Sequence, residues 1–259
     1  RPPRSTLFPY TTLFRSWLST DPVFRANMSG YLYGANNPII FVDPEGTTEF
    51  YFNGKWVGTD GVDNNVIGVV RSPELKRSIV ASTKQGNTFS VGNIGNGTKG
   101  DAYFGINADV LGKANSILTK QLTEKGKTGE FSAVMNQDGE SNFKTTFEKF
   151  QSGDGVDGLP SGDVSIHGHP TGLDDQGRPS RADLPSLRKD FGENSDEAAF
   201  ENFNTNIIVG NNGVIETHFN TQEDGSLKKT VLDKRYPAIN IFNNKSEGIG
   251  TIKRGEANS

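Results

Sequence analysis

Two of the three histidines in this chain stand in one short run, His167-Gly168-His169-Pro170. The apolar residues just before them predict a β-strand that covers Val164 to His169 and ends at the proline. Because a strand turns side chains i and i+2 to the same face, both imidazoles should point to one place. Imidazole nitrogen is a common ligand of transition metals, so the pattern indicates a metal site.

The other ligands of such a site must be histidine or carboxylate. The chain contains no cysteine, and this excludes both disulfides and thiolate ligands. A zinc ion would therefore be held by imidazole nitrogen and carboxylate oxygen.

Two further segments contribute residues that can do chemistry. Ser180-Arg181-Ala182-Asp183 follows the histidine pair, and Glu130 starts the earlier run Glu130-Phe131-Ser132-Ala133-Val134-Met135. In this order the motifs resemble the signature of the JAB/JAMM metallopeptidases. In that family a His-x-His-Pro strand and a Ser-x-x-Asp at the start of a helix bind zinc, and a glutamate on an earlier strand is the general base.

The resemblance covers roughly residues 105 to 220 and implies a zinc peptidase. It implies that Zn²⁺ is bound by His167, His169 and Asp183, with a water in the fourth position. Glu130 would then take the proton of that water and pass it to the leaving amine. The Ser180 hydroxyl would donate a hydrogen bond to the developing oxyanion.

Two features differ from the family pattern and leave the third ligand open. The loop between Pro170 and Ser180 is longer than usual, and Gly168 stands where serine or threonine is common. The longer loop offers Asp174 or Asp175 as alternatives to Asp183. Without the histidine run, Ser180 and Asp183 would form only a helix-capping pattern.

The surrounding periodicity predicts elements that can position these residues. Val110, Leu111, Ala114, Ile117, Leu118 and Leu122 lie on one face of a long helix, which Asn107 or Asp109 would cap and Gly126 would end. Further strands are expected over 130–135, 143–150, 206–209, 213–219 and 238–242, with a short helix from Ser180 to about Asp190. The expected fold class is α/β or α+β, a mixed sheet flanked by helices and preceded by short β-hairpins. The resemblance implies that this sheet has the JAB/JAMM (MPN-like, cytidine-deaminase-like) architecture.

The N-terminal part of the chain contains three different segments. Residues 1–16 include a stretch, 7–16, that resembles the translation of a short sequencing adapter, and we exclude them from the fold. Residues 17–46 contain the runs Trp-Leu-Ser-Thr-Asp-Pro, Asn-Asn-Pro and Asp-Pro-Glu-Gly. These runs resemble the end of an Rhs-repeat-associated core, which in Rhs proteins precedes an exchangeable toxin module. The pattern of residues 47–100 predicts β-hairpins, and one of these turns at Asn53-Gly54. It also predicts a strand over 66–70. Residues 101–259 would then be the JAB-like module.

The charge and hydrophobicity of the chain limit which classes of partner are expected. The 31 acidic and 27 basic side chains give a formal charge of −4 without a basic stripe, so nucleic acid is not an expected partner. No apolar run reaches the ~20 residues that span a bilayer, so no membrane span is expected.

The resemblances imply a secreted or surface-delivered bacterial toxin acting in a target cell. The chain does not begin with Met, and we expect it to be the C-terminal part of a longer protein. Its expected partners are a peptide or protein substrate, a cognate immunity protein and the Rhs carrier in cis. Two alternatives stay open, a metal-dependent nuclease toxin and a non-catalytic tip of a cell-surface Rhs protein.

Overall fold

A computed structural model describes residues 49–53, 55–62, 65–89, 102–139, 142–153, 158–174, 176–222 and 226–254. The segments expected to be adapter and Rhs core, residues 1–16 and 17–46, lie outside the described residues. The chain divides into two compact units. The first comprises Arg1–Gly112, Gln137–Lys144 and Gly255–Ser259, and the second comprises Lys113–Asn136 and Thr145–Arg254.

The first unit contains a four-stranded sheet in the order β2-β1-β3-β4. Its strands are β1 (Glu49–Phe52), β2 (Lys55–Thr59), β3 (Val66–Val70) and β4 (Tyr103–Asn107). The expected hairpin is confirmed, since β1 and β2 pair antiparallel with Phe52 opposite Lys55. The strand expected over 66–70 is also confirmed as β3, which pairs parallel to β1 and antiparallel to β4.

Helix α1 (Pro73–Lys84), between β3 and β4, was not expected from the apolar periodicity. Ser72 caps it by accepting a hydrogen bond from the Leu75 amide, and proline occupies the first turn. Its Ile79 is fully buried in a core cluster with Phe50, Val57, Val70 and Leu75. Through this cluster, α1 packs against the sheet of the first unit.

The long helix that the sequence predicts is α3 (Ala108–Gln121). Asn107 caps its start, because Oδ1 of Asn107 accepts hydrogen bonds from the amides of Asp109 and Val110. A short 3₁₀ turn, Lys125–Lys127, follows and leads the chain into the central sheet of the second unit.

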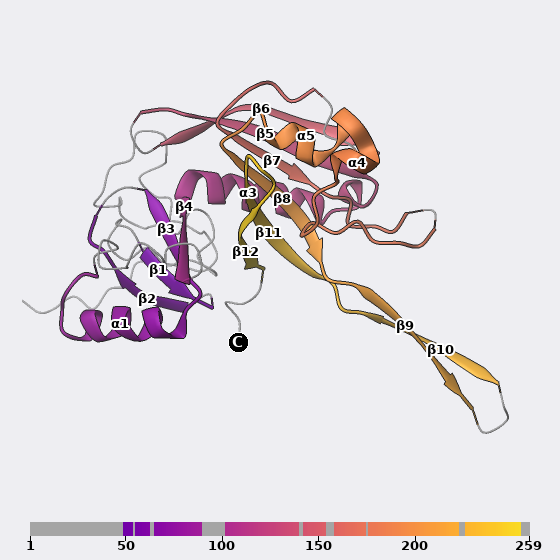
Figure 1. The fold of residues 1–259 in the computed structure, drawn as a ribbon, viewed down its shortest axis with the longest axis horizontal. Coiled ribbons are helices and arrows are strands. Elements are labelled where there is room, and N and C mark those ends of the chain that lie inside the picture. Colours follow the sequence, from indigo (N-terminus) through magenta and orange to yellow (C-terminus); the bar gives the residue numbers. More distant parts are fainter. Residues whose placement is uncertain are drawn as a thin grey trace, which may run out of the picture. The chain divides into compact units, whose positions relative to one another are not determined.

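The second unit is built on a six-stranded mixed sheet in the order β12-β11-β8-β7-β5-β6 (Figure 1). Its strands are β5 (Gly129–Gln137), β6 (Phe143–Ser152), β7 (Val164–Gly168), β8 (Thr205–Asn212), β11 (Tyr236–Asn243) and β12 (Gly248–Lys253). Strand β7 pairs antiparallel with β5 and parallel with β8. It therefore lies inside the sheet, and all five of its residues are buried.

Between β8 and β11 the chain forms a separate two-stranded sheet from β9 (Ile215–Thr221) and β10 (Leu227–Asp233). These strands extend from the six-stranded sheet as an arm (Figure 1). Phe219 and Leu227 on this arm are 63% and 67% exposed, so it adds little to the core.

The segment after β7 corrects one expectation. The helix expected from Ser180 to about Asp190 is wrong, because residues 180–187 form turns and irregular backbone. The helical residues come later, in α4 (Arg188–Phe191) and α5 (Asp196–Phe200). Two hydrogen bonds hold the irregular segment instead: the Ala182 amide donates to the Asn211 carbonyl, and the Asp196 amide donates to the Ser186 hydroxyl.

The coarse fold expectation is confirmed as a mixed α+β protein whose sheets are flanked by few helices. No helix among the described residues is both long and apolar enough to cross a bilayer.

Candidate metal centre

The two histidines lie at the carboxyl end of β7. His167 is inside the strand, opposite Ser132 of β5 and Ile208 of β8. His169 follows the last strand residue, and its amide still donates to the Val209 carbonyl of β8. Both side chains are buried, 1% exposed for His167 and 9% for His169. The strand therefore presents both imidazoles on one face, as the spacing predicts.

Asp196, the first residue of α5, completes the group. Ser195 caps α5 by accepting from the Ala198 amide, and Phe200 at its other end is fully buried in a cluster with Ala182, Ile208 and Phe242. Phe200 thus anchors the helix to the sheet beside the histidines. The Asp196 side chain is 6% exposed.

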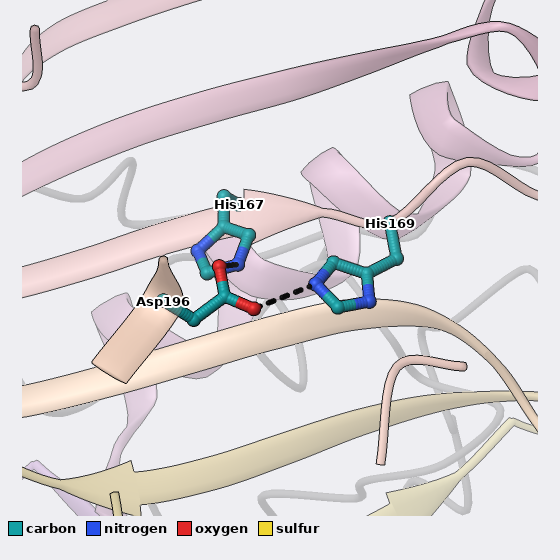
Figure 2. A group of neighbouring side chains, drawn as sticks. All are labelled: His167, His169 and Asp196. Carbon is teal, nitrogen blue, oxygen red and sulfur yellow. Dashed lines mark hydrogen bonds and ion pairs between the residues drawn. The ribbon is translucent and has the colours of Figure 1, made fainter. Parts of the chain in front are cut away.

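The three side chains point toward one another (Figure 2). Oδ1 of Asp196 lies 3.0 Å from Nε2 of His167, and Oδ2 lies 3.2 Å from Nε2 of His169. One ligand atom from each residue lies within 4.8 Å of the others. A buried group of two nitrogens and one oxygen at this spacing can hold a metal ion.

Hydrogen bonds orient the imidazole of His169. Its Nδ1 lies 2.9 Å from the carbonyl oxygen of Arg181, an acceptor, so Nδ1 carries the proton. That leaves Nε2, the atom that faces Asp196, available to a metal. A carbonyl on the far nitrogen of a ligating histidine is a usual second partner at metal sites, because it fixes both the ring and the tautomer.

The charges of the group are strongly coupled. Burial by itself lowers the pKa of His169, but the hydrogen bond to Asp196 and the negative charges of Asp196 and Glu130 outweigh burial and raise it to about 9. In Asp196, burial raises the pKa, and the interactions with His167 and His169 lower it well below its usual value. Without a metal, the site therefore holds a carboxylate against a protonated His169.

Asp196 has a further donor that fixes its orientation. The Ser186 amide donates to Oδ2 of Asp196 at 2.8 Å, and the Asp196 amide donates to the Ser186 hydroxyl at 2.8 Å. This reciprocal pair holds the irregular segment after Arg181 against the start of α5. The carboxylate is thus positioned from two sides before any ion binds.

Glu130 lies on the same face of the sheet as the histidines. Ser132 and His167 are directly opposed across the antiparallel pair β5 and β7, so their side chains share a face. Glu130, two residues before Ser132, faces the same way. It is 4% exposed, and its negative charge is one of the causes that raise the pKa of His169.

Ser132 is a polar residue that the sequence did not single out. It is 1% exposed, and its hydroxyl has no hydrogen-bond partner among the described residues. Its position directly across from His167 places a hydroxyl on the metal face. A buried hydroxyl without a partner is uncommon and is often explained by bound water or by a functional role.

Asp183, which the resemblance implied as the third ligand, is not brought to the histidines. Both of its oxygens are taken by the guanidinium of Arg181, at 3.0 Å from Nε and 2.6 Å from Nη2. The structure places Asp196 there instead. The helix that was expected to carry Asp183 does not form, because residues 180–187 are turns and irregular backbone.

The remaining expected residues also lie apart from the metal group. Asp174 is exposed and binds the Arg178 side chain and the amides of Gln176 and Arg178. Asp175 lies outside the described residues. Ser180 is half-buried in irregular backbone, and the part of the chain that the structure describes shows no hydrogen bond from it to the metal group.

Asp196 is the residue that sequence reasoning missed. Its local signal was Asn194-Ser195-Asp196-Glu197, a capping residue followed by two acids, which is typical of a helix start. That pattern is a signal for a helix start, which the expected elements did not include, and it carries no information that the helix faces β7. Only the packing of Phe200 against β8 and β11 supplies this information.

Neither a scan of protein-family models nor searches of curated proteins and of solved structures finds a match to this chain. Only the geometry and chemistry of the site therefore bear on the function of the chain.

Proposed function

We propose that the chain is a zinc-dependent hydrolase of peptide or isopeptide bonds, of the JAB/JAMM type. One observation carries the proposal. His167, His169 and Asp196 form a buried group that can hold a metal ion, and the carboxylate of Glu130 lies on the same face of the sheet.

The donor set favours zinc among the common ions. Two imidazole nitrogens and one carboxylate oxygen suit zinc, whereas magnesium and calcium prefer oxygen ligands throughout. Three protein ligands also leave a fourth tetrahedral position open, the usual arrangement of catalytic zinc sites. When bound, zinc would lower the pKa of a coordinated water to about 7 and polarise the substrate carbonyl.

The other roles fall to residues of the chain. Glu130, almost fully buried, would accept the proton of the attacking water and return it to the leaving nitrogen. The Arg181 carbonyl keeps the His169 ring turned so that Nε2 faces the site, and the Ser186 amide holds Asp196 in place. Ser180 was expected to stabilise the oxyanion, and the Ser132 hydroxyl, beside His167, is a second candidate for this contact.

The biological setting is proposed from the sequence of residues 17–46, which lie outside the described residues. Their resemblance to the end of an Rhs core supports a toxin module that a bacterial carrier delivers to a target cell. On this proposal, the carrier in cis and a cognate immunity protein are its partners.

The proposed function is tested by replacing Glu130 with glutamine, which keeps the shape of the side chain but removes the proton acceptor. Hydrolysis of quenched fluorogenic peptides and isopeptides by the zinc-loaded chain should fall about 10³-fold, since general-base catalysis contributes 10²–10⁴-fold. Zinc content, measured by atomic emission, should be unchanged.

Glu124→Gln is a matched control, because the Glu124 side chain is 88% exposed and pairs with Lys127 at the surface. It should keep the activity of the wild-type chain. Full activity in Glu130→Gln would exclude Glu130 as the base. Absence of hydrolysis in zinc-loaded wild type across both substrate classes would contradict the proposed function itself.

A further inference from the structure

Gln121, the last residue of α3, is a fully buried polar side chain with 0% exposure. Its amide nitrogen donates to the carbonyls of Gly126 and Gly129, each at 2.7 Å. Its amide oxygen accepts from the Phe131 amide at 3.1 Å. Both side-chain N–H groups and the oxygen therefore have partners, which is the condition for burying a carboxamide without penalty.

Two of these partners are the peptide groups on either side of Glu130. The carbonyl of Gly129 precedes Glu130, and the amide of Phe131 follows it. One carboxamide thus holds the backbone at the start of β5 on both sides of the proposed base. This fixes the direction in which the Glu130 side chain leaves the strand.

The same carboxamide packs against the strand that carries the histidines. A Cβ placed on Gly168 would lie 2.1 Å from Oε1 of Gln121 and 2.5 Å from its Cδ. Gly168 therefore has no room for a side chain, which accounts for glycine where serine or threonine was expected. Gln121 is in contact with the residue between His167 and His169 while it is bonded on both sides of Glu130.

The neighbouring chain reinforces this arrangement. The Thr171 hydroxyl donates to the carbonyl of Gln121 at 3.1 Å, and a Cβ on Gly126 would lie 2.0 Å from the same oxygen. The end of α3, the 3₁₀ turn and the segment after β7 are thus packed around one glutamine. Neither an apolar residue nor a glutamate could replace it, because two buried carbonyls require two N–H donors.

From this geometry we propose that Gln121 is a positioning residue that sets Glu130 relative to the histidines of the metal group. The inference builds on the proposed function, since it assigns a role within the same site. The hydrogen bonds of the Gln121 carboxamide go to backbone groups at or near the start of β5, not to the metal group. Gln121 acts through the backbone of Glu130, and proton transfer in a hydrolase is sensitive to displacements of about 1 Å.

The test is Gln121→Met in the full chain, since methionine is similar in length but has no N–H donor. Zinc affinity and KM should stay within about 3-fold of wild type, while kcat should fall at least 30-fold. Gln85→Met makes the same replacement at an exposed position and should leave kcat, KM and zinc affinity unchanged.

A second measurement does not depend on activity. In crystal structures of the zinc-loaded wild type and Gln121→Met, the Glu130 carboxylate should move by about 1 Å or more relative to the zinc ion, with the histidines unmoved. If wild type binds zinc but hydrolyses nothing, the proposed function fails, and this displacement still decides the role of Gln121.

Two results would overturn the proposal. One is an unchanged kcat together with an unmoved Glu130. The other is loss of zinc binding in step with activity, which would assign Gln121 to the histidine strand instead. If Gln121→Met does not fold, Gln121→Asn keeps the carboxamide but shortens the side chain so that it cannot reach both sides of Glu130, and the same outcomes apply.

Discussion

The start of α5 and the irregular segment after Pro179 each supply an aspartate, and the two lie in different environments. Asp196 is 6% exposed and lies between the imidazoles of His167 and His169. Asp183 is 28% exposed and is bound through both oxygens to the guanidinium of Arg181. Both carboxylates are paired, but with partners of different chemistry.

The difference shows which aspartate can serve a metal. An arginine is always protonated, so binding a metal at Asp183 would mean breaking a bidentate ion pair. An imidazole can give up its proton and become a ligand itself, so a metal can replace the proton held near Asp196. An aspartate beside histidines can therefore bind a metal together with its neighbours, whereas an aspartate beside arginine must first lose its ion pair.

The two aspartates should differ most in what each contributes to the stability of the metal-free protein. Asp196→Asn removes the negative charge that faces two buried imidazoles, and the free energy of unfolding near pH 6 should drop by roughly 3–5 kcal/mol. Asp183→Asn, at a partly exposed ion pair, should cost at most about 1 kcal/mol. Urea denaturation in the presence of a chelator measures both.

Equal losses of stability in the two variants would show that the surroundings of Asp196 and Asp183 do not differ in the way described. The two changes are matched in size and chemistry, so the environment is the only difference between them.

A smaller effect is expected from pH. The pKa of His169 is raised from 6.5 to about 9, so folding stabilises its protonated form. This contribution is fully present below pH 6.5 and is lost as pH rises through about 9, and in total it is roughly 3 kcal/mol. Metal-free wild type should therefore become less stable between these values.

His169→Gln cannot take up the proton and should lack this loss between pH 6.5 and 9. A wild-type stability that stays flat over that interval would contradict the assigned charge of the group. The Asp183→Asn variant should keep the wild-type pH profile, because Asp183 does not contact His169.

Several elements were predictable because their signals are local. The β1–β2 hairpin follows from Asn53 in a left-handed turn with φ of 49°, and α3 follows from its apolar face and the Asn107 cap. Helix α1 carried an equally local signal in Ser72-Pro73-Glu74, a cap followed by proline and an acid, but its apolar face is short. Strands β10 and β12 and the short helix α5 lacked a comparable apolar pattern.

The candidate site was predictable only in part, for the same reason. The shared face of His167 and His169 follows from strand geometry alone, and so does the shared face of Glu130 and Ser132. Asp196 comes from a separate helix whose position depends on the burial of Phe200. No local pattern distinguishes Asp196 from Asp183 as a metal ligand. Only the folded chain shows that the Asp183 carboxylate is bound by the Arg181 guanidinium.

Whether Asp196 is the third metal ligand can be measured as the zinc content of three purified full chains after dialysis against a weak chelator. The three chains are wild type, Asp196→Asn and Asp183→Asn. Wild type and Asp183→Asn should each retain one zinc ion per chain, and Asp196→Asn should retain little or none. Zinc kept by Asp196→Asn but lost by Asp183→Asn would contradict the account and return the third ligand to Asp183.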